Sequence, residues 1–288
     1  MKISVVMTSY NYAEYLPDAI ESVINQTYKD WELIIVDDGS TDNSVEIIKE
    51  YSKKDPRIKL FQHEEGVNKG LADTVKLGCE KASGDWIAFL ESDDKFTFDS
   101  LVMKCKAIEE NPNIDLIFTD LTLIGEKNPN IDKYFQNREE NFLKKDSSTF
   151  VSDFPQILPK LNIIPTFSVV MVKKELLLNC DFNCPCKSSL DAYLWAQLSD
   201  KNIYYLNEKL SYWRIHDNSY LNRDKTNWFT KYYFNIKIYY FTIRGKNLLL
   251  KTLLLLNYMR ARLIYLKCDK KSIKLNLLND VIIFEKLF

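Results

Sequence analysis

Glycine is scarce in this chain, and the common glycine-rich phosphate-binding motifs are missing. The 288 residues include only 7 glycines, and neither G-x-G-x-x-G nor G-x-x-x-x-G-K-S/T occurs. Those motifs bind nucleotide phosphates through backbone N–H groups in Rossmann dinucleotide sites and in P-loops. Their absence argues against both kinds of site. A diphosphate bound by this chain is therefore expected to be held by a metal ion rather than by a glycine loop.

The cysteines show neither a secretory nor a zinc-binding pattern. The chain has 6 of them. Met1-Lys2 leads directly into a strand-like segment, so no signal peptide is expected. Reduced thiols and a cytoplasmic location are the resulting expectation. Cys180, Cys184 and Cys186 have the spacing C-x3-C-x-C, which is not a standard zinc spacing. Free thiols are therefore favoured there over a structural metal.

Long uninterrupted apolar runs are absent as well. The strongly apolar stretch 248–256 contains Lys251 and is followed by Arg260 and Arg262. A membrane-spanning helix needs about 20 consecutive apolar residues, so none is predicted. Across the chain, 46% of residues are hydrophobic and 13% are aromatic. That composition is sufficient for a proper core and argues against a disordered protein.

Positive charge is concentrated in the last quarter of the chain. Residues 220–288 have a balance of +10, whereas residues 1–219 have a balance of −11. The aromatic residues of this tail alternate with lysines and arginines. We expect a helical region that lies on an anionic membrane at the inner face of the cell membrane. The equal alternative is a cap or a homo-oligomer surface. No nucleic-acid motif is present, so nucleic acid is not an expected partner.

Short apolar runs typical of buried strands alternate with helical patterns in the first third of the chain. Strands are predicted at 3–7, 33–36, 58–61 and 87–90. Pro17 opens a predicted helix, a second helix follows Thr41 or Asp42, and a third spans 71–81. Strands that alternate with helices form right-handed βαβ units. The sequence therefore predicts an α/β fold with a mainly parallel sheet.

Acidic residues follow directly after one of these strands. The run Ile87-Ala88-Phe89-Leu90 ends in Glu91, Ser92, Asp93 and Asp94. Buried strands exclude unpaired carboxylates, so the acids are expected just beyond the strand's carboxyl end, where α/β sheets bind ligands. Converging carboxylates suit Mg²⁺ or Mn²⁺. The alternative is a strand followed by an ordinary helix-capping Asp.

Polar residues also follow the two other strands that should lie beside it. The first strand leads into Thr8-Ser9-Tyr10-Asn11, and the second ends in Asp37 and Asp38. Carboxyl ends of parallel strands meet at one sheet edge, so these groups should share a crevice with Asp93 and Asp94. Asp37 and Asp38 suit the base and ribose of a nucleotide, and Asp37 has the alternative role of bracing its turn.

These residues carry a family resemblance. The segment SVVMTSYNYAEYLPDAIESVINQTYKDWELIIVDDGSTDNS, residues 4–44, resembles the start of a family-2 glycosyltransferase of the GT-A fold. The segment GDWIAFLESDD resembles the stretch that ends in that family's metal-binding acids. With a downstream Asp and the Arg214-x-His216 element, the resemblance covers roughly residues 3–219.

The resemblance implies inverting transfer of a sugar from a nucleotide-sugar, usually a UDP-sugar, to a hydroxyl of a glycan or a lipid-linked glycan. Mn²⁺ or Mg²⁺ is the implied cofactor. A Rossmann-related GT-A sheet flanked by helices is the implied fold. Asp191 matches the catalytic base. The matched nucleotide-binding positions are Thr8, Tyr10, Asp38 and Asp93, and the matched metal positions are Asp93, Asp94 and His216.

Three positions depart from the family pattern. Glu91 stands where Asp is usual, which keeps the charge but lengthens the side chain. Leu190 precedes Asp191 where an acid is frequent. Val75-Lys76 replaces a common Arg-Asn pair. Lys69 or Lys76 is a candidate to restore the lost positive charge at the nucleotide, although each is equally well explained as a surface lysine.

Two of the matched residues have structural alternatives. Asp191 precedes an apolar helical pattern and would serve as a helix N-cap. His216 lies among aromatic residues and would serve as a structural histidine.

We expect a catalytic domain at 1–219, with a nucleotide half at about 1–111 and an acceptor half at about 112–219, followed by the C-terminal region 220–288. Within the acceptor half, a strand at 115–119 precedes a polar stretch through Ser148. That stretch is interpreted as an acceptor loop or a solvated insertion. A further strand is predicted at 166–172.

Two other functions use the same features. A nucleotidyltransferase also holds Mg²⁺ and a nucleotide with acids at strand ends, but no glycine-rich loop follows the first strand. A sugar-nucleotide-binding protein without turnover is favoured by the departures at Glu91 and Leu190 and disfavoured by Asp93, Asp94 and Asp191.

Overall fold

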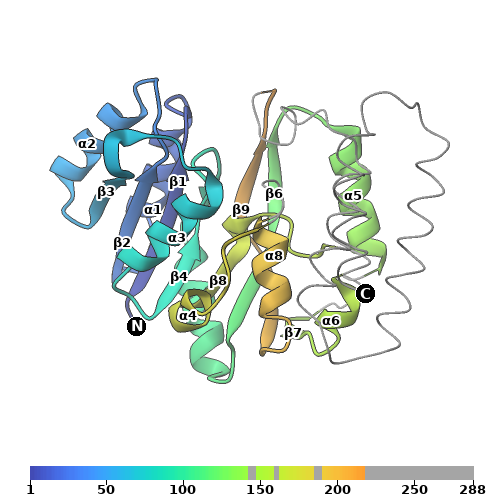
Figure 1. The fold of residues 1–288 in the computed structure, drawn as a ribbon. Helices are drawn as coiled ribbons and strands as arrows, with labels where there is room; N and C mark the ends of the chain where they lie inside the picture. The colour runs from blue at the N-terminus through green and yellow to red at the C-terminus, as the bar shows by residue number, and fades with distance from the viewer. Residues whose placement is uncertain (142–146, 159–161, 185–189, 218–288) are drawn as a thin grey trace, which may run out of the picture. The chain divides into compact units, whose positions relative to one another are not determined.

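A computed structural model describes residues 1–141, 147–158, 162–184 and 190–217 of the chain. Its described strands form one sheet in the order β3-β2-β1-β4-β8-β6-β9-β5, and β7 pairs with β9 (Figure 1). The predicted C-terminal region 220–288 and Cys186 lie outside the described residues. Within the described part of the chain, no helix combines the length and apolar character needed to cross a membrane.

The first four long strands pair in parallel, as the alternating pattern predicts. They are β1 (Ile3–Ser9), β2 (Trp31–Asp37), β3 (Ile58–Gln62) and β4 (Trp86–Phe89). The helices between them are α1 (Leu16–Ile24), α2 (Ser44–Lys54) and α3 (Leu71–Lys81). All seven residues of β2 are buried, which explains the apolar run Leu33-Ile34-Ile35-Val36 within it.

The second half of the sheet mixes both directions. β8 (Val170–Lys173) is antiparallel to β4 and to β6 (Leu116–Gly125). β9 (Ile203–Ile215) runs parallel to β6. The short strands β5 (Lys95–Phe96) and β7 (Thr149–Phe150) are both antiparallel to β9. The α/β class is confirmed. The four neighbouring strands β3, β2, β1 and β4 form the continuous parallel part of the sheet.

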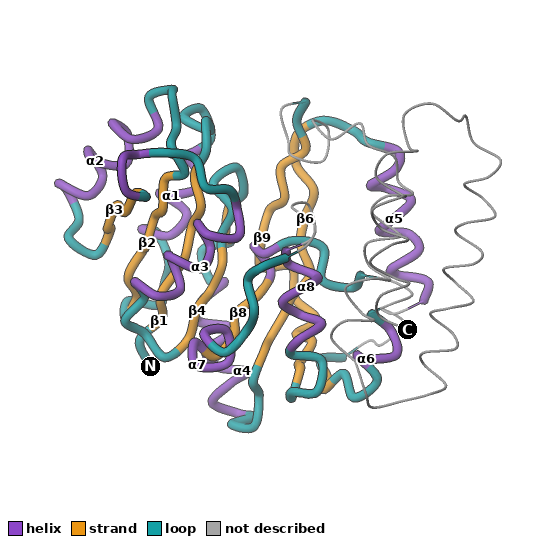
Figure 2. The backbone as a smooth tube through the Cα atoms, viewed as in Figure 1, coloured by secondary structure: helices purple, strands orange, loops and turns teal. Residues whose placement is uncertain are grey.

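The remaining helical elements are α4 (Ser100–Glu110), α5 (Pro129–Asn141), α6 (Phe154–Ile157), α7 (Lys174–Leu178) and α8 (Leu190–Gln197). Two 3-10 turns, η1 (Glu64–Gly66) and η2 (Phe167–Val169), complete the described elements. Figure 2 shows helices on both faces of the sheet.

Alternate residues of β1 pack on opposite helical layers. Val5 and Met7 belong to a buried apolar cluster that includes residues of α1 and α4. Val6 faces the other way, where a Cβ added at Gly78 of α3 would lie 2.5 Å from its Cγ1. Glycine at this position therefore lets α3 lie close against β1 and β2. This packing holds the strand ends that carry the polar residues.

The polar stretch after the strand predicted at 115–119 is not a loop in its described part. β6 continues to Gly125, and α5 follows it. Arg138 of α5 is fully buried, donates from Nη1 to Asp120 Oδ1 at 2.8 Å and donates from Nε to the carbonyl of Ile163 at 2.8 Å. The loop prediction was wrong. Besides this ion pair, Ile131 is buried, the hydroxyl of Tyr134 donates to the carbonyl of Asn162, and the ring of Phe135 packs edge-on against Trp213. These few contact residues lie in an otherwise polar segment, so the helical pattern was not recognised. Residues 166–172 likewise form η2 followed by β8 rather than one strand.

Candidate active site

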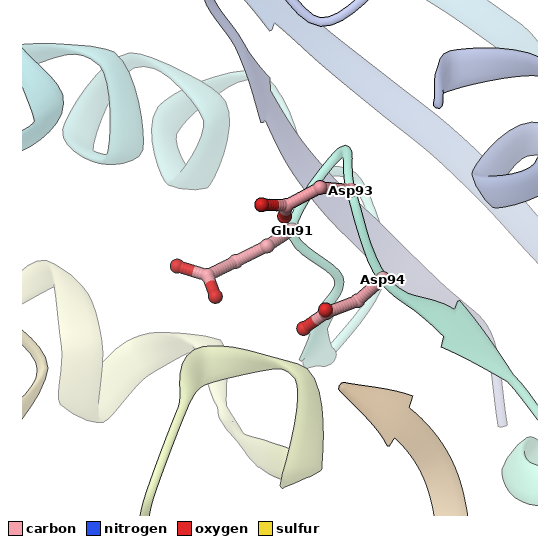
Figure 3. A group of neighbouring side chains, drawn as sticks. All are labelled: Glu91, Asp93 and Asp94. Atoms are coloured by element: carbon pink, nitrogen blue, oxygen red, sulfur yellow. The ribbon is translucent and has the colours of Figure 1, made fainter. Parts of the chain in front are cut away.

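Glu91, Asp93 and Asp94 form one acidic cluster directly after β4. One carboxylate oxygen from each lies within 4.8 Å of the others. The N–H of Leu90 donates to the carbonyl of Val6, and the N–H of Asp94 closes a turn on the carbonyl of Glu91 at 3.0 Å. All three side chains extend to the same side of this turn (Figure 3). The acids predicted to converge at the carboxyl end of β4 therefore do so.

Asp94 joins the acidic turn to two other elements. Its carboxylate is fully buried. Oδ2 accepts a hydrogen bond of 2.6 Å from Ser168 Oγ in η2, and Oδ1 accepts one of 3.0 Å from the N–H of Arg214 in β9. Such charge-assisted bonds fix the carboxylate. The residue thus holds the cluster between three segments that are distant in sequence.

Asp93 contacts the Arg214-x-His216 element. His216 Nε2 lies 3.1 Å from Asp93 Oδ2. The ring of Tyr15 packs on the imidazole with a centroid separation of 4.6 Å. Arg214 Nε donates to the carbonyl of Asp93 at 3.0 Å. His216 therefore joins the acidic cluster, as the motif predicts, and it is also held among aromatic residues.

Glu91 is held by η2 as well. Its Oε2 accepts a hydrogen bond of 2.7 Å from Thr166 Oγ1, and its N–H donates to Ser168 Oγ at 3.0 Å. Ser168 thus contacts both the backbone of Glu91 and the carboxylate of Asp94. Neither Thr166 nor Ser168 is predicted from the sequence as a site residue. Their hydroxyl groups could have indicated this role. They lie at one end of the apolar run that contains β8, just as polar residues lie at the ends of β1, β2 and β4.

The cluster carries more negative charge than its surroundings neutralise. Burial, followed by the neighbouring charge of Asp93, raises the pKa of Glu91 to about 8. Burial and the charges of Asp93 and Glu91 raise the pKa of Asp94 well above its ordinary value. A divalent cation would relieve this repulsion and favour the charged carboxylates. Three carboxylates and one imidazole make a donor set that suits Mn²⁺ or Mg²⁺.

Asp37, the last residue of β2, and Asp38, which follows it, both accept hydrogen bonds from backbone N–H groups. Asp37 accepts from the N–H of Ser40 at 3.0 Å and so braces its turn. Asp38 accepts from the N–H of Lys69 at 2.7 Å and from that of Gly70 at 3.0 Å. His63 Nε2 lies 3.5 Å from Asp38 Oδ1. Asp38 thereby attaches the loop before α3 to the carboxyl end of β2. The position of His63 beside Asp38 is not predicted from the sequence.

The predicted nucleotide residues lie at this edge with one exception. Thr8 is in β1, Tyr10 follows it with 39% of its surface exposed, and the N–H of Asp38 donates to the carbonyl of Ser9 at 2.9 Å. Lys76 instead lies on the exposed side of α3, where its Nζ is 4.0 Å from Glu80. The structure therefore does not bring Lys76 to the acidic cluster.

Asp191 is the second residue of α8 and lies within its first turn rather than before it. Burial raises its pKa to about 6, against the opposing effect of the backbone N–H groups of Ala192 and of Asp191 itself. Its charge contributes to the raised pKa of Glu91, so it lies near the acidic cluster. A carboxylate with this pKa is charged at neutral pH and can accept a proton.

Comparison with known proteins identifies the family. The model of glycosyl transferase family 2 matches residues 4–160. The chain therefore belongs to glycosyl transferase family 2, as the opening segment and the acidic motif predict.

Two curated relatives illustrate the match. A putative teichuronic acid biosynthesis glycosyltransferase of Bacillus subtilis is 31% identical over 75% of this chain and 80% of its own length. The GalNAc(5)-diNAcBac-PP-undecaprenol beta-1,3-glucosyltransferase of Campylobacter jejuni is 30% identical over 74% of this chain and 65% of its own length. The chain spans only 27% and 33% of the uncharacterized glycosyltransferases that it matches in Rickettsia bellii and Rickettsia felis.

Solved structures share the fold. TarS of S. aureus, crystallised with UDP-GlcNAc, superposes with a TM-score of 0.70 at 20% identity, covering 91% of this chain and 72% of that one. The mannosyltransferase PcManGT of Pyrobaculum calidifontis, solved with GDP-Man and Mn²⁺, has a TM-score of 0.61 at 14% identity, covering 98% of this chain and 80% of that one. The predicted GT-A-like α/β fold is thereby confirmed.

Proposed function

We propose that this chain is a metal-dependent inverting glycosyltransferase. It would move a sugar from a nucleotide-diphosphate donor, a UDP-sugar, to a hydroxyl of a glycan or lipid-linked glycan. The observation that carries the proposal is the cluster of Glu91, Asp93 and Asp94 beside His216. This cluster lies at the sheet edge that also bears Thr8 and Asp38, so one edge offers groups for a metal, a diphosphate and a nucleoside.

The relatives support the donor and acceptor classes. TarS was crystallised with UDP-GlcNAc, and PcManGT with GDP-Man and Mn²⁺. The Campylobacter relative is named for an undecaprenol-PP-linked glycan, and the Bacillus relative for teichuronic acid biosynthesis. We accordingly propose a role in cell-envelope polysaccharide biosynthesis, at the cytoplasmic side of the membrane.

The residues of the chain divide the work of the reaction. Asp93, Asp94 and His216 would hold Mn²⁺ or Mg²⁺, which supplies charge neutralisation for the departing diphosphate. Thr8, Tyr10 and Asp38 would bind the nucleoside, with Lys69 a candidate for added positive charge. Asp191 would take the proton of the acceptor hydroxyl as that oxygen attacks the anomeric carbon. Attack on the face opposite the leaving group inverts the anomeric centre.

Donor turnover tests this proposal. The full chain is incubated with a series of nucleotide-sugars and Mn²⁺, Mg²⁺ or excess chelator, and the release of nucleoside diphosphate is measured. We expect release with a UDP-sugar and metal, and none with chelator. Asp93→Asn should abolish release while the circular dichroism spectrum stays unchanged. Asp200→Asn, at a side chain that is 60% exposed, is the matched control and should retain full activity.

The alternatives give different products. A nucleotidyltransferase would consume a nucleoside triphosphate and release pyrophosphate, whereas a binding protein would bind UDP-sugar without forming product. Full activity in excess chelator would contradict the metal-dependent mechanism.

A further inference from the structure

The acidic motif after β4 begins with a glutamate, Glu91. Glu91 stands where the family usually has Asp, so its carboxylate is one methylene farther from the backbone and has one more rotatable bond. A longer side chain adopts more rotamers, and each must be restricted before the carboxylate can serve as a fixed ligand. A neighbouring group that fixes the Glu91 carboxylate would therefore favour its use as a metal ligand.

Thr166 supplies such a group. Its Oγ1 donates to Glu91 Oε2 at 2.7 Å. The same oxygen accepts a hydrogen bond from the N–H of Ser168 at 3.3 Å, which caps the start of η2. Thr166 is only 4% exposed. Its hydroxyl is thus held by the backbone of η2, and its proton is directed at the glutamate.

We propose that Thr166 is a positioning residue that adapts the metal site to Glu91. With Oε2 held by the hydroxyl, the orientation of the carboxylate is restricted, and Glu91 would be one of the residues that hold the metal ion. The side chain of Asp is one methylene shorter, so on the same backbone its carboxylate would lie farther from Thr166. The pair Glu91 and Thr166 thus replaces the single Asp of the family pattern. This inference rests on the metal dependence proposed above.

Hydrogen-bonded groups that orient metal ligands typically contribute about 10–100-fold to metal affinity. Thr166→Val removes the hydroxyl and keeps the shape of the side chain. Thr166→Ser keeps the hydroxyl. Glu91→Asp removes the group that the hydroxyl holds. These three variants separate a specific effect on the ligand from a general loss of packing.

The experiment measures Mn²⁺ binding to the full chain by electron paramagnetic resonance, with and without UDP. We expect Thr166→Val to weaken Mn²⁺ binding by about 10–100-fold and Thr166→Ser to bind as the parent does. In a Glu91→Asp background, Thr166→Val should change the affinity less than twofold. Thr97→Val is the matched control, because it removes a hydroxyl–carboxylate bond to Asp99 of 2.8 Å away from the cluster, and it should leave Mn²⁺ affinity unchanged.

Two results would overturn the inference. One is an unchanged Mn²⁺ affinity in a folded Thr166→Val variant. The other is an equal loss of affinity in the parental and Glu91→Asp backgrounds, which would indicate a structural role only. If the parent protein itself binds no Mn²⁺, the metal dependence of the proposed function fails, and the inference falls with it. The parent measurement therefore separates the two failures.

Discussion

Single residues in this protein gain their chemistry from burial beside other charges. Asp93 and Asp94 are ordinary carboxylates in the sequence, but the turn after β4 brings them together with Glu91 and His216. Burial and mutual repulsion raise the pKa values of Glu91 and Asp94, and the divalent cation that we propose at this site would relieve that repulsion.

Asp191 shows the same principle for proton transfer. Because burial raises its pKa to about 6, it is charged at pH 7 and loses that charge as the pH falls through about 6. We expect the rate of sugar transfer to decline about tenfold per pH unit below that value, since only the charged form accepts a proton. Asp191→Asn should lower transfer by about 10²–10⁴-fold with donor affinity unchanged.

Two measurements check this prediction: steady-state rates across a pH series that brackets this pKa, and donor titrations. The exposed Asp200→Asn variant is the control. An Asp191→Asn variant that folds and transfers sugar at the parental rate would show that the carboxylate only stabilises the start of α8.

At the level of elements, a buried ion pair connects α5 to the sheet. Arg138 is fully buried and Asp120 nearly so, and the Nη1–Oδ1 distance is 2.8 Å. Asp120 also lies at an irregularity in the pairing of β6 with β9. The pair therefore connects the helix to the sheet at a point where the ladder is interrupted.

Arg138→Met should lower the free energy of unfolding by about 3–5 kcal/mol, because it leaves the carboxylate of Asp120 buried and unpaired. The double variant Asp120→Asn/Arg138→Met should recover part of that loss, since no isolated charge remains. Urea denaturation followed by tryptophan fluorescence measures both changes.

Lys133→Met is the matched control, because Lys133 lies on the exposed side of the same helix. It should change stability by less than about 0.5 kcal/mol. Equal effects of Lys133→Met and Arg138→Met would show that the buried pair has no special role.

At the level of the whole molecule, charge separates the described catalytic part from the rest of the chain. Residues 1–219 carry −11 and residues 220–288 carry +10. We propose that the basic, aromatic C-terminal region binds an anionic membrane and so keeps the catalytic domain near lipid-linked acceptors.

The full chain should bind phosphatidylglycerol vesicles in a sedimentation assay, and the binding should fade as salt is added because the attraction is screened. Truncation after Ser219 should weaken that binding, and neutral phosphatidylcholine vesicles should bind weakly in both cases. If the full chain ignores anionic vesicles at low salt, the C-terminal region is instead a cap or an oligomer surface.

Local pattern was sufficient to predict the parallel part of the fold and the location of its polar edge. The helix at 71–81 and the strands near 3–7, 33–36 and 58–61 appear as predicted because their apolar residues repeat at helical or strand spacing. The acids after β4 could be placed at a strand end because a buried strand cannot hold unpaired carboxylates.

Tertiary structure alone decided what those acids contact. Asp94 is bound by Ser168 and by the N–H of Arg214, 74 and 120 residues away, and Glu91 by Thr166, 75 residues away. No local periodicity encodes such partners. Helix α5 was missed because the residues that attach it, Ile131, Tyr134, Phe135 and Arg138, lie in an otherwise polar segment and include a buried charge whose partner, Asp120, is on another element. The sequence determines which segments can be strands or helices, whereas long-range hydrogen bonds and desolvation decide which of their polar groups form a site.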